Sequence, residues 1–120
     1  KDPAFADAAL NLAVTYQKLG SHEKAIETLK GIDLVKESHP EYYYALGASY
    51  FHLEYYRSAE EAFLSARRID PWHFKALFSL AMIYTRTGRK AEAKAAWNEY
   101  ISIAPDDEWK DLAKKRLREL

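Results

Sequence analysis

The sequence predicts an all-α protein built from short helical repeats, and three observations lead to that prediction. Ala contributes 19 of the 120 residues and Leu 13, whereas Val, Ile and Thr together contribute 12. Ala loses no side-chain entropy in a helix whereas β-branched residues do, so this balance favours helix over strand. Only four Gly and four Pro are present, which is too few for a turn-rich β-sandwich. Finally, a pattern of apolar residues recurs every 34 positions, as in stacked helical hairpins.

Each 34-residue unit contains two helical stripes. The first stripe ends in a Leu-x-x-x-Tyr segment at 12–16, 46–50 and 80–84, and the second carries an Ala at 25, 59 and 93. Apolar positions spaced three and four apart mark one face of a helix, and Asp70-Pro71 ends the second stripe because Pro disfavours helix at the residue before it. We therefore expect helices near 4–19, 22–35, 41–53, 56–69, 72–87, 90–103 and 107–119.

The apolar register also predicts the core. Small residues at Gly47, Ala59 and Ala66 would let helix backbones approach, while a large side chain fills the space between them. Because one hairpin cannot bury its own apolar face, neighbouring hairpins must stack. The residues expected to be wedged between helices are Tyr16, Leu29, Tyr50, Phe63, Tyr84 and Trp97.

Three positions depart from an ideal repeat or mark a helix end. Gly20 and Gly88 stand at the corner between the two helices of their units, whereas the middle unit has Glu54, which must make that turn instead. Gly31 lies inside the second expected helix, which should bend or fray after Lys30. Asp106 or Asp107 is the expected N-cap of the last helix.

The 34-residue pattern resembles the tetratricopeptide repeat (TPR). The resemblance implies a right-handed α-solenoid of three helix-turn-helix repeats, at 6–39, 40–73 and 74–107, followed by a capping helix at 108–120. We interpret residues 1–5 as the remnant of an upstream repeat, because Asp2-Pro3 falls at the register of Asp70-Pro71. The alternative is that Pro3 simply begins the first helix.

The composition predicts no catalytic, metal or cofactor site. The 18 basic and 18 acidic residues cancel, Cys is absent, and no phosphate-binding Gly-rich loop occurs. The four His stand at 22, 39, 52 and 73, outside any zinc-binding H-E-x-x-H motif, and Ser49 with His52 lacks a carboxylate placed to orient the imidazole. We therefore expect no enzyme, no cofactor, no nucleic-acid partner and no membrane insertion.

The resemblance places a peptide-binding groove on the first helices of successive repeats. The centre of this groove would be apolar and aromatic with a charged rim, a composition that protein interfaces favour. The alternative is that these side chains pack against neighbouring helices. The candidate groove residues are Leu10, Val14, Tyr44, Phe51, His52, Lys75, Phe78, Met82 and Arg86.

The expected partner is a protein or peptide segment with apolar side chains. TPR domains that clamp the C-terminal carboxylate of heat-shock chaperones use Lys, Asn and Arg at five positions. Here those positions hold Leu10, Val14, Ala45, Lys75 and Ser79, and only Lys75 matches. A carboxylate buried against Leu and Val would be unpaired, so that clamp is disfavoured.

The alternative function is structural. The stretch 4–19 is apolar over most of its surface, so the chain could be a slice of a longer solenoid that spaces domains or self-associates weakly through its N-terminal helix. The compartment stays open, with the cytoplasm slightly favoured, because targeting segments could be missing from this stretch of sequence.

Overall fold

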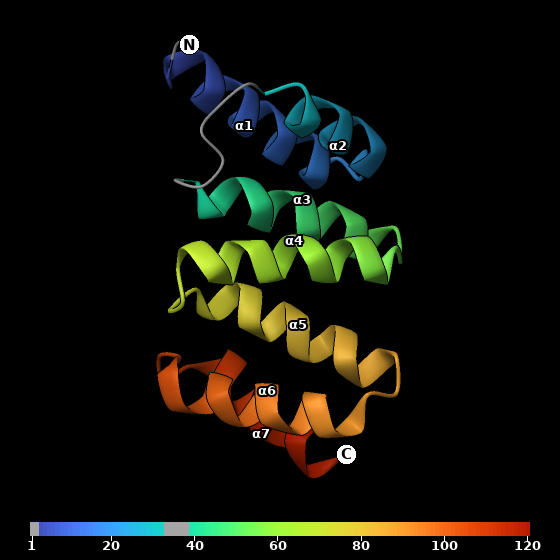
Figure 1. The fold of residues 1–120 in the computed structure, drawn as a ribbon, viewed down its shortest axis with the longest axis vertical. Helices are drawn as coiled ribbons and strands as arrows, with labels where there is room; N and C mark the ends of the chain where they lie inside the picture. The colour runs from blue at the N-terminus through green and yellow to red at the C-terminus, as the bar shows by residue number, and fades with distance from the viewer. Residues whose placement is uncertain (1–2, 33–38) are drawn as a thin grey trace.

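The computed structural model describes residues 3–32 and 39–120, with side chains in the first helix described from Asp7 onward. Within these residues the chain forms seven helices and no strand (Figure 1). Their bounds are α1 (Pro3–Lys18), α2 (His22–Lys30), α3 (Pro40–His52), α4 (Tyr56–Ile69), α5 (Phe74–Arg86), α6 (Lys90–Ile103) and α7 (Glu108–Arg118).

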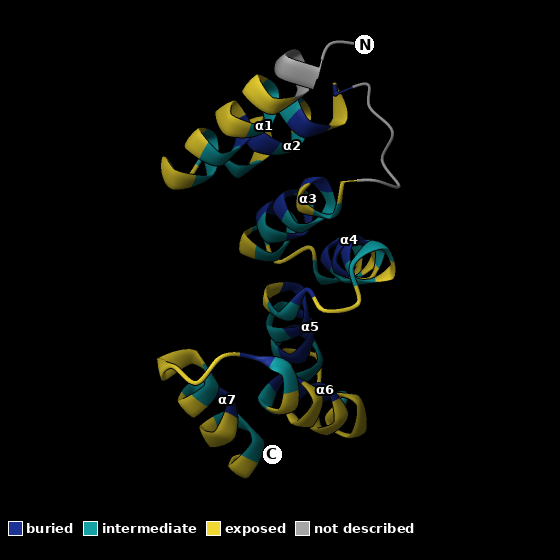
Figure 2. Ribbon diagram, turned by 90° about the vertical axis from the view of Figure 1, so that its left-hand side faces the viewer, coloured by how far each residue is buried: buried dark blue, intermediate teal, exposed yellow. Residues whose placement is uncertain are grey.

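The helices are arranged as three stacked hairpins with one additional helix. The pairs α1/α2, α3/α4 and α5/α6 form the hairpins, and α7 packs against α6 (Figure 1). Seen from the side, α4 and α6 lie on one side of the stack and α7 lies on the other (Figure 2). The expected all-α solenoid of stacked helical hairpins is therefore confirmed.

Two of the expected helix bounds differ from the structure by two or more residues. Helix α2 ends at Lys30 rather than at residue 35, because Gly31 is its C-cap and donates its N–H to Glu27. This end agrees with the disruption expected after Lys30, and residues 33–35 lie outside the described part of the chain. Helix α5 begins at Phe74 rather than at residue 72, because the backbone N–H groups of Trp72 and His73 donate to Asp70 in a turn before the helix.

The corners of the three hairpins share one backbone conformation. Gly20 has φ 79° and Gly88 has φ 76°, a left-handed region that glycine enters freely. At the equivalent position Glu54 has φ 63° and is the one non-glycine residue with positive φ in the described chain. Glu54 therefore makes the turn, as expected, at a steric cost that glycine avoids.

The large anchors on the second helix of each hairpin are buried. Leu29, Phe63 and Trp97 have relative exposures of 0%, 1% and 0%. Phe63 packs against the backbone of Gly47, and the Trp97 indole N–H donates a 3.0 Å hydrogen bond to the Thr85 hydroxyl. These contacts hold each hairpin together from within.

The three tyrosines of the same register are only half-buried, in contrast to the expected wedge between helices. A phenol buries its ring but needs a polar contact for its hydroxyl, so it tends to lie at the edge of a core. A cation lies over each of the three rings. The pairs are Lys24 with Tyr16 at 6.0 Å from the ring centre, Lys30 with Tyr50 at 5.8 Å, and Arg89 with Tyr84 at 4.6 Å.

Two ion pairs tie the second repeat to the third. The Arg89 guanidinium lies 2.6 Å from Glu60 of α4, and Arg67 lies 2.9 Å from Glu99 of α6. Thirty-four residues before Glu60 and Glu99 stand Ile26 and Ser65, which have no carboxylate. The two glutamates therefore have no counterpart at the preceding junction.

At that preceding junction, hydrogen bonds replace the ion pairs. The Gln17 side-chain amide donates to the Ala45 carbonyl at 2.7 Å and lies 2.8 Å from the Ser49 hydroxyl. These bonds attach α1 to α3 because Gln17 reaches across from one hairpin to the next.

Candidate functional site

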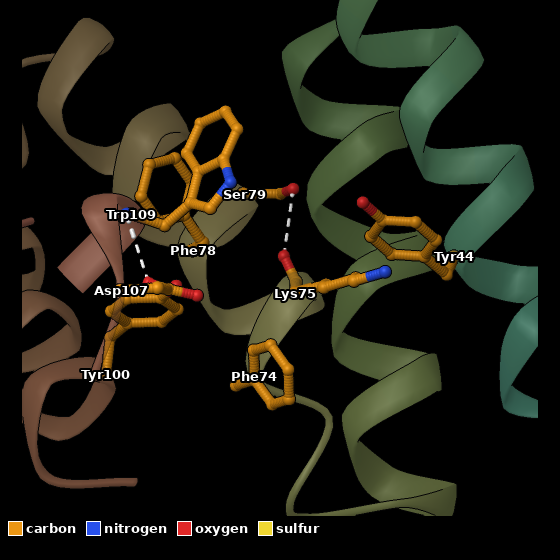
Figure 3. Close-up of a pocket in the computed structure, with 8 residues that line it drawn as sticks. All are labelled: Tyr44, Phe74, Lys75, Phe78, Ser79, Tyr100, Asp107 and Trp109. Atoms are coloured by element: carbon orange, nitrogen blue, oxygen red, sulfur yellow. Dashed lines mark hydrogen bonds between the residues drawn. The ribbon is translucent and has the colours of Figure 1, made fainter. Parts of the chain in front are cut away.

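A pocket of about 460 Å³ opens between α3, α5, α6 and the start of α7 (Figure 3). We call it the C-terminal pocket. Its volume suits a large side chain or a short peptide segment. Five aromatic and three polar residues line it: Tyr44, Phe74, Lys75, Phe78, Ser79, Tyr100, Asp107 and Trp109.

The aromatic wall of the pocket centres on Phe78. Its ring meets the rings of Trp97, Tyr100 and Trp109 edge to face, with centroid separations of 5.0, 5.1 and 5.5 Å. Edge-to-face pairs of this kind stabilise one another beyond the area they bury. The four rings therefore form one continuous cluster, although Trp109 itself is 53% exposed.

The start of α7 positions Trp109. Asp107 is the N-cap, and its Oδ1 accepts from the backbone N–H groups of Trp109 and Lys110 at 3.0 and 3.1 Å. The sequence offered Asp106 or Asp107 as the cap, and the structure assigns it to Asp107. A capping carboxylate stabilises the first turn of a helix, so Trp109 is held over Phe78 (Figure 3).

Two phenols supply hydrogen-bond donors to the pocket. Burial, followed by the charge of Glu41, raises the pKa of Tyr44, although the Ser79 hydroxyl acts in the opposite direction. Burial, followed by the charge of Asp107, raises the pKa of Tyr100. Both phenols therefore keep their protons at neutral pH and can donate to an acceptor on a ligand.

Lys75 supplies the cation at the pocket. Its side chain is exposed, and its ammonium group points toward Tyr44 (Figure 3). The Ser79 hydroxyl one turn later donates to the Lys75 backbone carbonyl at 3.1 Å. The pocket thus combines an aromatic wall with one positive charge, Lys75, and one negative charge, Asp107.

Only three of the nine candidate groove residues line this pocket: Tyr44, Lys75 and Phe78. The other six lie elsewhere on α1, α3 and α5. The Arg86 guanidinium covers the Phe51 ring at 4.9 Å, and His52 stacks on His22 with ring centres 4.6 Å apart. Leu10, Val14 and Met82 are half-buried; Leu10 and Met82 pack against the N-terminal and C-terminal core clusters. The nine residues therefore do not converge on one cavity.

Sequence reasoning missed five of the eight pocket residues: Phe74, Ser79, Tyr100, Asp107 and Trp109. The resemblance assigned the groove to the first helices of the repeats, whereas Tyr100 lies on a second helix and Trp109 on α7. One sequence signal could have indicated this part of the pocket. A capping Asp at 107 followed by a Trp at 109 predicts an aromatic side chain in the first turn of a helix.

Two shallower clefts lie along α4, away from the pocket. One, of about 370 Å³, is lined by residues of α2, α3 and α4, and the other, of about 240 Å³, by residues of α4, α5 and α6. The eight residues lining the first, shifted by 34, are all among those lining the second. The Arg67–Glu99 ion pair borders the second cleft. In the first cleft Ser65 stands at the position equivalent to Glu99, and this cleft has the larger volume.

Residues 3–32 and 39–120 contain no group of three or more His, Asp or Glu side chains placed to hold a metal ion. None of the seven helices there has the length and apolar character to cross a membrane.

Stacked helical hairpins closed by an extra helix define a helical-repeat solenoid, and comparison with known families identifies the repeat. Three family models described as tetratricopeptide repeat match residues 1–49, 40–71 and 74–107. The chain therefore belongs to the tetratricopeptide repeat family. No curated protein sequence matches it.

Solved structures share the fold. MamA is 26% identical, with a TM-score of 0.80 over 98% of this chain and 77% of MamA. The type III secretion chaperone SycD of Yersinia enterocolitica, solved in complex with a peptide of the translocator YopD, is 19% identical, with a TM-score of 0.88 over 98% and 93% of the two chains. The first TPR of Spaghetti (RPAP3), bound to the HSP90 peptide SRMEEVD, is 22% identical, with a TM-score of 0.87 over 98% and 91%. At these identities the last two show the fold alone.

Proposed function

We propose that this chain is a non-catalytic protein-interaction module that binds an apolar or aromatic segment of a partner protein. The observation that carries the proposal is the aromatic wall of the C-terminal pocket, formed by Phe78, Tyr100 and Trp109. Rigid aromatic anchors lose little entropy on binding and are enriched among the residues that dominate interface energies. SycD and Spaghetti, which share the fold, were solved with peptides bound, and this supports a peptide ligand.

The partner's anchor is an apolar side chain because a polar one would leave the aromatic wall desolvated without compensation. Its flanking backbone accepts hydrogen bonds from the Tyr44 and Tyr100 phenols, which remain protonated at neutral pH. An interface of this kind would bury about 1,000–1,600 Å². We expect affinity in the micromolar range, near about −8 kcal/mol.

A carboxylate clamp of the chaperone-tail type is a poorer fit. Three of its five positions hold Leu10, Val14 and Ala45, and Ala45 is 5% exposed. These side chains offer no donor to an anionic tail, so Lys75 would act alone. A single exposed ion pair contributes only about 0–1 kcal/mol.

The test uses two exposed tryptophans as a matched pair. Peptides that bind the parent protein are first selected from a random library and measured by fluorescence anisotropy. Trp109→Ala should weaken binding about tenfold or more, because Trp109 lines the pocket and is half-exposed. Trp72→Ala removes an indole that is 70% exposed and lies outside the pocket, so it should leave affinity within about twofold. Equal effects of the two variants would refute the proposal.

A second pair of variants tests how far the groove extends. Phe51 lies near the C-terminal end of α3, outside the C-terminal pocket, and its ring is covered by Arg86. Glu61 lines the first cleft along α4. If the ligand runs from the pocket along α3, Phe51→Lys should lose most of the affinity and Glu61→Lys almost none. Unchanged binding by Phe51→Lys would confine the site to the C-terminal pocket.

A further inference from the structure

His73 is the one buried histidine in the described part of the chain, with an exposure of 7%. It precedes α5 and is the N-cap of that helix. No part of the proposed binding site uses it directly, since it does not line the C-terminal pocket. A buried imidazole must satisfy both ring nitrogens, because an unpaired polar atom in the interior is costly.

The partners of the two nitrogens determine which one carries the proton. Nδ1 lies 3.1 Å from the backbone nitrogen of Ala76, and Nε2 lies 2.8 Å from Oε1 of Glu41. A backbone N–H can only donate, so Nδ1 is the acceptor and has no hydrogen. The Glu41 carboxylate accepts, so Nε2 carries the hydrogen. His73 is thus a neutral imidazole in one tautomer.

The same ring joins α5 to α3 beside the pocket. Glu41 lies in the first turn of α3, and Tyr44 follows three residues later on the same face. The Tyr44 ring lies 5.0 Å from the His73 ring and 5.7 Å from the Phe63 ring. Tyr44 is therefore held between the cap of α5 and the core of the second hairpin at the point where it enters the pocket.

The preceding repeat provides an internal comparison. His39 stands 34 residues before His73 and is likewise an N-cap, of α3, but it is exposed and its side chain makes no capping hydrogen bond. A histidine at this register is therefore not required to begin a helix. The bridge between two helices is particular to His73 and Glu41.

We infer that His73 is a positioning residue for the C-terminal pocket, because its Nε2–H holds Glu41 and thereby Tyr44 against the start of α5. The inference rests on the proposed function of that pocket. A cap alone would need only an acceptor for the Ala76 N–H. The additional 2.8 Å bond to Glu41 links the α3 wall of the pocket to the start of α5.

Separate variants distinguish the two roles of the ring. His73→Asn keeps a good N-cap acceptor, but its side chain is too short to reach Glu41. Glu41→Ala breaks the same link without altering the cap, whereas Glu41→Gln keeps an oxygen acceptor for Nε2–H. His39→Asn is the matched control at the equivalent position. The probe is 1-anilinonaphthalene-8-sulfonate, whose fused rings suit the aromatic wall and whose sulfonate suits Lys75.

We expect His73→Asn and Glu41→Ala to weaken probe binding about threefold or more, a typical effect for residues that act through a neighbour. Both variants should melt close to the parent, and the nuclear Overhauser contacts between the rings of residues 44 and 63 should weaken in each. Glu41→Gln and His39→Asn should match the parent in all three measurements. The ¹⁵N shifts of His73 in the parent should report a protonated Nε2.

Two results would overturn the inference. One is parent-like probe binding by His73→Asn and Glu41→Ala while Trp109→Ala weakens it, because the pocket would then bind without the bridge. The other is a protonated Nδ1 in the parent. If Trp109→Ala leaves probe binding unchanged, the proposed pocket function fails instead, and the inference fails with it.

Discussion

The Phe63 ring of α4 packs so closely against Gly47 of α3 that a Cβ added at Gly47 would lie 2.8 Å from two of the ring carbons. Phe63 is 1% exposed and cannot swing aside. Gly47 sits inside a helix, where glycine is normally unfavourable by about 1 kcal/mol relative to alanine. Its presence there reflects the space that Phe63 needs rather than any requirement of the α3 backbone.

Gly47→Ala should therefore lower the free energy of unfolding by about 1–3 kcal/mol, because overpacking outweighs the gain in helix propensity. Urea unfolding followed by circular dichroism measures the change. Gly31→Ala is the control, since its Cβ would meet only backbone oxygens at 3.5 and 3.6 Å, and it should be neutral or stabilising. A Gly47→Ala protein as stable as the parent would contradict the close packing.

Glu54→Gly should stabilise the protein by about 0.5–1 kcal/mol, because glycine adopts the positive φ of this corner without the steric cost that a side chain incurs. The gain is reduced by the greater freedom of glycine in the unfolded chain. Thermal melting measures it. Gly88→Ala at the equivalent corner should lower the melting temperature, and a drop for Glu54→Gly would show that the Glu54 side chain stabilises the turn.

Trp97→Ala should cost roughly 3–5 kcal/mol, because it removes a fully buried indole and its hydrogen bond to Thr85. That is a large part of the about 5–15 kcal/mol that holds a domain of this kind folded. Trp72→Ala, at an exposed indole, should cost little in the same urea titration. Parent-like stability of Trp97→Ala would show that the 34-residue register is wrong.

The free energy of unfolding should decrease as the pH is lowered, because His22 becomes protonated. Burial, followed by the charge of His52, lowers the pKa of His22 below its ordinary value of 6.5, although Glu23 opposes the change. The unfolded chain then binds a proton more readily than the folded one, so stability is lost as pH falls through about 6.5 and levels off below the folded-state pKa.

The structural cause is visible in the ring pair. The two imidazoles stack at 4.6 Å, and Nδ1 of His22 is buried without a hydrogen bond to the described residues. Urea unfolding of the parent and of His22→Gln at about pH 7.5 and pH 5 tests the effect. The variant should lose less stability between these two conditions, and His39→Gln, at an exposed histidine, should behave like the parent. Equal losses in all three proteins would contradict the prediction.

Weak self-association through α1 stays a prediction. Leu12 on α1 is 47% exposed, and Leu19, which follows the last residue of α1, is 73% exposed. Exposed apolar side chains favour association between copies, so sedimentation coefficients should rise with concentration. Leu12→Lys should reduce that rise, whereas Leu64→Lys on α4, at a leucine with 45% exposure, should not. A concentration-independent monomer would remove the idea.

The sequence alone determined the repeat architecture. Apolar residues at a period of 34 predict which faces meet, because each hairpin can bury its stripe only against the next. The same register predicted that Glu54 makes the corner of the second hairpin, that the second helix is disrupted after Lys30 and that Phe63 is buried, and the structure has all three. These features depend on neighbours within one hairpin, so local pattern was enough to find them.

Only the tertiary structure decided the shape of the candidate site. The pocket combines a second helix, a capping Asp and Trp109 of α7, none of which the groove positions include. His39 and His73 share one register, yet one is exposed and the other bridges α5 to Glu41. Their sequence positions are equivalent, but their surroundings depend on which helix packs across the junction, and that is a contact between residues about thirty positions apart. Periodicity specifies the direction of a side chain on its own helix, whereas packing of the neighbouring hairpin specifies what that side chain meets.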